Sequence, residues 1–181
     1  MNFIYETDRL YIQILNGTYA AQSLRFYEDD RELFERYEPT RPNNFYTENY
    51  HRYLLNYEYN RILRGDLMRY YFFPKDDADR IIGTVSLRNI VHGAYEKCEI
   101  GYKLSGDYQG QGYAREGIAC VLQIAFEELG LRRIEAYCMP ENASSIRLLE
   151  SLHFQPEGRL RQYVQINGRY EDHLLYSLLR D

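Results

Sequence analysis

Apolar positions along the chain follow two alternating periods, which predict a succession of strands and helices. A period of two predicts strands over residues 9–15, 67–73, 81–90, 95–104, 132–138, 159–166 and 169–179, the stretch 9–15 being the first. A period near four predicts helices over residues 18–38, from Thr47 to a stop at Gly65, from Gly112 to a stop at Gly130, and over 143–152. Four residues share one face of the second helix: Tyr50, Tyr53, Leu54 and Tyr57.

The order of these elements predicts one α/β (α+β) domain over residues 1–181, with no linker that divides it. Short turns between neighbouring strands favour a mixed, mostly antiparallel sheet flanked by helices. Asn167-Gly168 is the strongest hairpin signal in the chain and predicts that 159–166 pairs with 169–179. Residues 95–138 differ, because a helix between two strands is typical of a parallel, right-handed crossover.

The net charge of −5 and the isoelectric point of about 5.5 argue against a nucleic-acid-binding protein, which usually has a basic face. They leave room for a cationic substrate, although for the charge alone an acidic soluble surface is the better explanation. Cys98, Cys120 and Cys138 form no metal-ligand motif, so no metal is expected. No signal peptide and no apolar stretch of transmembrane length are found in the sequence, which predicts a cytoplasmic protein without membrane contact.

The stretch GYKLSGDYQGQGYAREG, residues 101–117, places two glycines between a predicted strand and a predicted helix. A dinucleotide-binding fingerprint requires a small residue three positions after Gly112, where this chain has Arg115. A P-loop is excluded because no Gly-Lys-Ser/Thr follows. Two interpretations remain from the residues alone. The helix N-terminus binds a phosphate group, or the glycines only supply the φ angles of a turn.

Several segments together resemble the GNAT N-acetyltransferase family. The loop QGQGYA is similar to the Q/R-x-x-G-x-G/A signature, which in that family holds the pyrophosphate of acetyl-CoA. Upstream, CEIGYKL resembles the cofactor-facing strand, and downstream, PENASSIRLLESLHF resembles the later N-x-x-S helix segment. The tail, EGRLRQYVQINGRYEDHLLYSLL, is similar to the RimJ/RimL-type branch, which acetylates protein N-terminal amines. The first half of the chain resembles the family only in the order of its elements.

The resemblance implies a GNAT-like domain that moves an acetyl group from acetyl-CoA to a primary amine by direct attack on the thioester, without a metal. Backbone N–H groups of the strand would pair with the pantetheine arm, and one nearby N–H would hold the thioester oxygen. The cofactor contacts implied by the resemblance are Tyr102, Lys103, Leu104, Gln109, Gly110, Gln111, Gly112, Tyr113, Ala114 and Asn142.

Glu99 matches a strand position where several family members carry a general base. A carboxylate with a pKa of about 4.3 is a weak base for an ammonium with a pKa of about 10. A catalytic role would therefore require burial of Glu99 or a water chain that passes the proton along. The alternative is a solvated strand residue, with Cys98 and Ile100 facing the core instead.

Asn142 and Ser145 match a pair that lies beside the cofactor thiol in RimJ/RimL-like proteins, where the serine is a candidate proton donor. Asn142 is equally explained as a helix N-cap and Ser145 as an ordinary first-turn residue. Many family members place a tyrosine acid further along this helix, where this chain has Leu149. The acid is therefore Ser145, water or absent; a thiol with a pKa of about 8.5 leaves with modest help.

The acceptor amine is expected between the first two helices and the terminal hairpin. Candidate residues that attract its positive charge are Glu28, Asp29, Asp30 and Glu38, with aromatic rings lining the slot; acids in solvent and inward-packed tyrosines are the alternative. Three functions remain open: an N-terminal protein acetyltransferase, a small-molecule (polyamine or amino-sugar) acetyltransferase, and a non-catalytic acyl-CoA-binding domain. The tail favours the first, and the presence of Glu99, Asn142 and Ser145 together argues against the third. The expected partner is the amine substrate, and the protein a monomer or homodimer.

Overall fold

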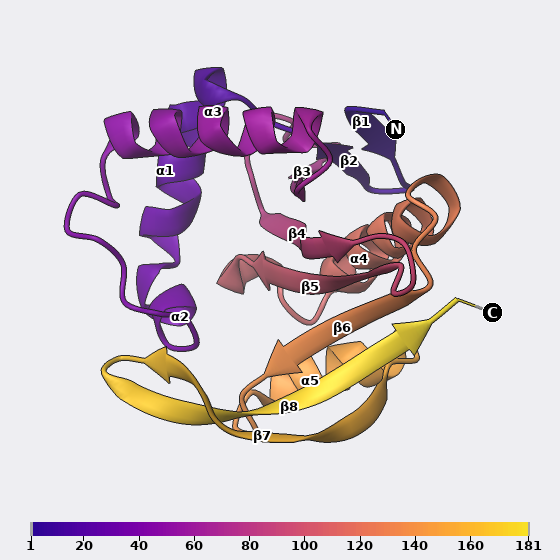
Figure 1. The fold of residues 1–181 in the computed structure, drawn as a ribbon. Coiled ribbons are helices and arrows are strands. Elements are labelled where there is room, and N and C mark those ends of the chain that lie inside the picture. Colours follow the sequence, from indigo (N-terminus) through magenta and orange to yellow (C-terminus); the bar gives the residue numbers. More distant parts are fainter. Residues whose placement is uncertain (1, 181) are drawn as a thin grey trace.

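The computed structural model describes residues 2–180, which fold around one eight-stranded sheet. Its strands are β1 (Ile4–Glu6), β2 (Leu10–Gln13), β3 (Met68–Pro74), β4 (Gly83–Val91), β5 (Lys97–Leu104), β6 (Arg133–Cys138), β7 (Gln155–Ile166) and β8 (Arg169–Leu179). They lie in the order β1-β2-β3-β4-β5-β6-β8-β7, and every neighbouring pair is antiparallel except β5 and β6 (Figure 1). The predictions of a mostly antiparallel sheet and of one parallel crossover are both confirmed.

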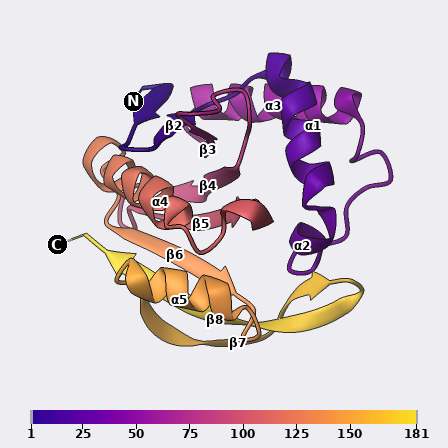
Figure 2. The same cartoon turned by 180° about the vertical axis from the view of Figure 1, so that it is seen from behind.

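Two groups of helices cover the two faces of the sheet. The first group lies between β2 and β3 and contains the 3₁₀ turn η1 (Gly17–Tyr19), α1 (Ala20–Asp29), α2 (Arg31–Glu35) and α3 (Glu48–Leu63). The second group contains the 3₁₀ turn η2 (Gly106–Tyr108), α4 (Tyr113–Gln123), the π-helical turn η3 (Ile124–Glu128) and α5 (Ala143–Ser151). Figure 2 shows α4 and α5 in front of the sheet, on the face opposite that seen in Figure 1. Among residues 2–180 no helix is long and apolar enough to cross a membrane.

Strand β3 contributes to two separate cores because helices cover both of its faces. Tyr70 and Phe72 pack in the core beneath α4, whereas Tyr71 and Phe73 pack beneath α1 and α3. All four side chains are buried, and each large buried ring stabilises the fold by roughly 2 kcal/mol. Helix α4 lies very close to β3, because a Cβ at Gly117 would meet the Phe72 ring at 2.5 Å. The glycine is therefore required for packing.

The stretch 18–38 is helical as predicted over most of its length, but the prediction of one continuous helix is wrong, because the structure divides it into α1 and α2. Asp30 has φ −114° and ψ 27°, which separates α1 from α2. Its carboxylate accepts hydrogen bonds from the Ser105 hydroxyl and, at 2.9 Å, from the Gly106 N–H. Asp30 thus ties the first helices to the loop that follows β5, a tertiary contact that the local periodicity cannot reveal. The sequence also missed β1, which precedes the predicted first strand and pairs with β2.

Helix α3 begins and ends as predicted. The Thr47 side chain accepts a hydrogen bond from the Tyr50 N–H, and Gly65 follows the helix with φ +79°. The four residues of the predicted shared face divide in the structure. Tyr50 packs against the core beneath α1 and α3 and Leu54 is half-buried, whereas Tyr53 and Tyr57 are exposed and their rings stack at 6.2 Å. The buried residues of α3 are His51, Leu55, Glu58 and Ile62. Burial of a histidine and a glutamate is explained by their polar partners, Ser23 and Arg69.

Candidate active site

The parallel strands β5 and β6 separate before either one ends. Their pairing stops at Ile100 and Ala136, although β5 continues to Leu104 and β6 to Cys138. Beyond that point β5 keeps its pairing with β4, and β6 keeps its pairing with β8. The facing edges of β5 and β6 therefore carry backbone groups that are not used in the sheet. The sequence alone could not show this separation.

The glycine loop lies directly beside the open edge of β5. Gly112 is the N-cap of α4 with φ +85°, and Gly110 has φ +72°. Both angles are costly for residues with a side chain, so the turn by itself accounts for the two glycines. A Cβ at Gly110 would meet no atom within 4 Å, and no side chain caps α4. The first N–H groups of α4 are consequently available to an anionic ligand.

Arg9 holds this loop, and no local pattern in the sequence points to it. Its guanidinium donates from Nη1 to the Gln111 carbonyl oxygen at 2.9 Å and from Nε to Glu116 at 2.7 Å. It also lies over the Tyr113 ring, 4.2 Å from the ring centre. Burial acts to raise the pKa of Glu116, but hydrogen bonds from Thr7 and Arg9 outweigh it and leave this pKa below its ordinary value. Only the fold brings Arg9 and α4 together, since over a hundred residues separate them.

Glu99 lies on the opposite face of β5 from Cys98 and Ile100. Both neighbours are buried in the core beneath α4, as the alternative interpretation required, but Glu99 is only half-buried and lines a cavity. The Asn89 side-chain amide donates to its Oε1 at 2.9 Å. Asn89 reaches this position from an irregularity in β4 between Arg88 and Val91, where its φ is +50°.

Asn142 and Ser145 lie at the start of α5, across the gap from β5. The Asn142 side chain accepts from the Ser145 N–H at 3.1 Å, which confirms it as the N-cap. The Ser145 Oγ lies 2.8 Å from the Tyr102 hydroxyl and also contacts the Cys138 thiol. Burial raises the pKa of Cys138 to about 11, although the bond from Ser145 acts in the opposite direction. Residues of β5, β6 and α5 thus meet where the two strands separate.

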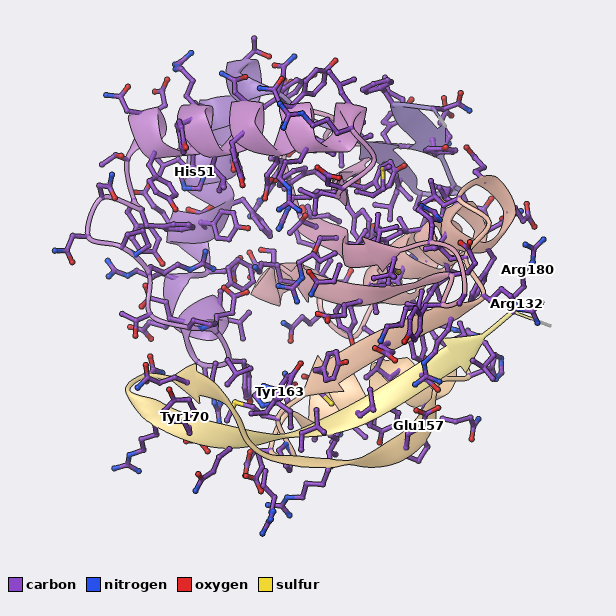
Figure 3. All side chains as sticks on the ribbon, in the orientation of Figure 1. His51, Arg132, Glu157, Tyr163, Tyr170 and Arg180 are labelled. Carbon is purple, nitrogen blue, oxygen red and sulfur yellow. The ribbon has the colours of Figure 1, made fainter. Side chains whose placement is uncertain are left out.

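A cavity of about 950 Å³ joins these parts into one site. Ten of the twelve residues predicted for the site line it: Glu99, Tyr102, Lys103, Leu104, Gln109, Gly110, Gly112, Ala114, Asn142 and Ser145. Gln111 and Tyr113 do not; the Gln111 side chain donates to the Asp107 carbonyl, and Tyr113 packs against Tyr108. On its other side the cavity extends to α2, α3 and the β7–β8 hairpin, where Tyr163 of β7 (labelled in Figure 3) stacks on Tyr137 of β6.

The four acidic residues predicted to attract the acceptor, Glu28, Asp29, Asp30 and Glu38, do not gather around the cavity. Of the four, only Glu38 lines this cavity, and both Arg41 and Lys103 form ion pairs with it. Asp30 instead ties down the loop after β5, as described above. Within residues 2–180, three acids line the cavity, and Glu99 is the one without an ion pair, because Glu58 pairs with Arg69 at 2.9 Å.

The site suits a long molecule that carries phosphate groups at one end. The glycine loop and the start of α4 offer backbone N–H groups to phosphates, and the open edge of β5 offers a line of backbone donors and acceptors to an extended arm. In the same cavity, basic residues outnumber acidic ones, the former being Arg41, Arg69, Arg88, Lys103, Arg115 and Arg147. No group of three or more potential metal ligands occurs among the described residues.

Comparison with known proteins gives consistent similarities. Residues 9–155 match the family described as Acetyltransferase (GNAT) domain. The probable N-acetyltransferase YjcK of Bacillus subtilis is 36% identical over 170 residues, which cover 94% of this chain and 93% of that protein. The structure of ribosomal-protein-S5-alanine acetyltransferase from Vibrio fischeri has a TM-score of 0.94 at 27% identity and covers 99% of this chain and 98% of its own. Mycobacterium smegmatis RimJ, in complex with CoA-disulfide, has a TM-score of 0.88 at 25% identity, over 94% of this chain and 81% of its own.

Proposed function

This chain belongs to the GNAT acetyltransferase family and is an N-acetyltransferase, and we propose that it transfers the acetyl group of acetyl-CoA to the N-terminal amine of a protein or peptide. One observation carries the proposal: a single cavity runs from the glycine loop, past the open edge of β5, to Glu99. A donor with a phosphate end and an extended arm fits the part of the cavity between the glycine loop and the edge of β5. An amine that approaches from the side of α2, α3 and the hairpin meets Glu99.

Acetyl-CoA supplies a thioester whose carbonyl carbon is open to attack by a neutral amine. The residues that would hold its pyrophosphate are Gly110, Gly112 and the first N–H groups of α4, with Gln109 and Ala114 alongside. Backbone groups of Tyr102 to Leu104 would pair with the pantetheine arm. An N–H of this edge would also stabilise the oxyanion that forms on the thioester oxygen, an effect of typically a few kcal/mol for each donor.

Glu99 would accept the proton that the amine must lose. It is the acid of the cavity without an ion pair among the described residues, so its negative charge is available to an approaching ammonium group. The bond from Asn89 fixes the carboxylate while leaving one oxygen unoccupied by that bond. The geometry therefore supports Glu99 as the group that binds and deprotonates the acceptor.

The chemistry of the acceptor favours an α-amine. An α-amino group has a pKa of about 7.7–8.0, so about a tenth of it is neutral at pH 7, whereas less than about 0.1% of a lysine-like amine with a pKa of about 10.4 is neutral. A half-buried carboxylate is therefore a sufficient base for an α-amine and a poor base for a lysine-like amine. Glu38 and Glu58 already pair with basic residues of the cavity, so Glu99 is the one carboxylate of the described lining left for an amine, which disfavours a polyamine with several positive charges. The name of the Vibrio fischeri structure, ribosomal-protein-S5-alanine acetyltransferase, supports the same class of acceptor.

The test is thiol release from acetyl-CoA with a panel of acceptors. Peptides with a free N-terminus should release thiol, and the same peptides with a blocked N-terminus and an internal lysine should not. Polyamines and aminoglycosides form the competing arm. Turnover with these compounds alone would replace the proposed acceptor, and acetyl-CoA binding with no turnover on any acceptor would reduce the protein to a binding module.

A further inference from the structure

The hydroxyl groups of Tyr102 and Ser145 form a hydrogen bond with each other, which the roles predicted for the two residues do not require. The two oxygens lie 2.8 Å apart, which is the normal length of a hydrogen bond between hydroxyl groups. The predicted role of Tyr102 involves only its backbone, and Ser145 is predicted to act alone. Their side chains come from β5 and from the first turn of α5, 43 positions apart in the chain.

The separation of β5 from β6 allows this contact. Cys98, Ile100 and Tyr102 alternate onto the sheet face that α4 and α5 cover. The pairing with β6 ends at Ile100, so Tyr102 is the first residue on that face with no β6 neighbour beside it. Its ring packs against the core, and its hydroxyl reaches the start of α5. Both residues line the cavity where the sulfur atom of the donor is expected.

Two other polar groups, Asn142 and Cys138, lie near Ser145, but neither replaces Tyr102 as the partner of the Ser145 hydroxyl. The Asn142 side chain accepts from the Ser145 N–H at 3.1 Å and from the Ser144 hydroxyl at 2.9 Å, and it makes no bond to the Ser145 Oγ. The Cys138 thiol contacts Ser145 too, but burial keeps it neutral at physiological pH, as its pKa of about 11 implies. Tyr102 is thus the hydroxyl partner of Ser145 in the described part of the chain.

We propose that Tyr102 is a positioning residue that acts through Ser145: its phenol donates to the Ser145 Oγ and turns the Ser145 proton toward the sulfur of the departing coenzyme A. The proposal rests on the proposed acetyl transfer. In that transfer the amine forms the new C–N bond, the C–S bond breaks with its electron pair going to sulfur, and a proton lost by the amine finally neutralises the thiolate. Tyr102 and Ser145 keep their own protons, because a phenol and an alcohol are weaker acids than a thiol. Their effect is to stabilise negative charge on sulfur while the bond breaks.

The buried surroundings of Tyr102 keep its phenol protonated, so that it can act as a hydrogen-bond donor. Burial raises the pKa of its phenol well above the ordinary value, and the bond with Ser145 lowers it by less. The phenol therefore stays protonated throughout the range in which the amine reacts.

The decisive experiment measures the thiol pKa of bound coenzyme A and does not require an acceptor. Coenzyme A labelled with ¹³C next to the sulfur is titrated by NMR in its complex with the wild type, Tyr102→Phe, Ser145→Ala and the double variant. We expect the wild-type complex to hold this pKa below the ordinary value of about 8.5. Both single variants should raise it by about one pH unit, and the double variant should raise it no further, since the two hydroxyls act in series. Tyr70→Phe is the matched control, because Tyr70 is buried on β3 outside the cavity lining.

An unchanged thiol pKa in Tyr102→Phe would overturn the proposal, whether or not Ser145→Ala shifts it. A larger shift in the double variant than in either single variant would also overturn it. With any accepted amine, kcat of Tyr102→Phe should fall about 10-fold with an unchanged KM for acetyl-CoA. The titration uses no acceptor, so an error in the proposed acceptor would not change its result. The two proposals can therefore fail separately. Failure of the wild type to bind coenzyme A would overturn both proposals.

Discussion

The Arg9 guanidinium reaches Glu116 with a 2.7 Å contact from Nε to Oε2 and joins the N-terminal segment to the first turn of α4. The same arginine bonds the Gln111 carbonyl inside the glycine loop. The loop that is proposed to hold the pyrophosphate is therefore fixed from outside by a residue of the chain's first ten. Because Glu116 has a lowered pKa, this tie is complete above the ordinary carboxyl range and is lost as the pH falls through the lowered value.

Arg9→Ala should loosen the glycine loop. We expect the affinity for acetyl-CoA to fall about 10-fold and the free energy of unfolding to fall by about 1 kcal/mol, since the ion pair is partly exposed. Titration calorimetry and chemical denaturation measure the two effects. Arg159→Ala is the control, because Arg159 forms a similar ion pair with Asp172 at 2.7 Å on the distant hairpin. Equal affinities in the two variants would contradict the role of Arg9.

Gly110→Glu should abolish acetyl-CoA binding while the protein still folds. The new side chain places a negative charge at the proposed phosphate site, and we expect a loss of affinity of more than about 100-fold. Gly65→Glu is a matched control, because Gly65 also has a positive φ and a Cβ there would also meet no atom within 4 Å. Both substitutions should cost a similar amount of backbone strain, about 1–2 kcal/mol. Undiminished affinity in Gly110→Glu would remove the phosphate assignment.

Glu99→Gln should slow catalysis and leave donor binding unchanged. If Glu99 accepts the amine proton, kcat near neutral pH should fall by about 100-fold or more, because the amide cannot take up a proton. The pH–rate profile of the variant should differ from that of the wild type. Glu127→Gln is the control, since Glu127 lies on η3 outside the cavity lining and, among the contacts described, accepts a hydrogen bond only from Gln123. A pH–rate profile identical to that of the wild type would rule out Glu99 as the base.

His51 should make the stability of the protein depend on pH between about 6.5 and 4. It is fully buried between α1 and α3 with its Nδ1 2.9 Å from the Ser23 hydroxyl (Figure 3). Burial, and then the positive charge of Arg41, lower its pKa to about 4. The unfolded chain takes up a proton near the ordinary pKa of about 6.5, so stability is complete above that pH and decreases as the pH falls toward 4, by at most about 1.4 kcal/mol per pH unit.

Denaturation of the wild type and of His51→Asn across this pH range tests the assignment. The variant should be less stable at pH 7 because of the smaller side chain, but its stability should change less between pH 6.5 and 4. His92→Asn is the control, because His92 is exposed and pairs with Glu96 on the surface. The same slope in His51→Asn as in the wild type would show that another group titrates.

The sequence determined the elements whose signals are local. The hairpin at Asn167-Gly168, the helix start at Thr47, the N-cap Asn142 and the stop at Gly65 depend on turn and capping chemistry within a few residues, and the structure confirms each. The glycine loop was likewise placed correctly between a strand and a helix, because the period of the apolar positions changes there from two to nearly four, a signal that neighbouring residues carry.

Only the tertiary structure decided how these pieces meet. Asp30 breaks a helix that its periodicity predicted, because its carboxylate is bound to the loop after β5. The same applies to Glu38, which is neutralised by Lys103 from a different element, and to Tyr102, whose hydroxyl finds Ser145 only where β5 and β6 separate. The physical reason is the range of the interactions. Capping and periodicity act over one or two turns of chain, whereas the charges and hydroxyls of this site are partnered across distances in sequence that only the folded sheet brings together.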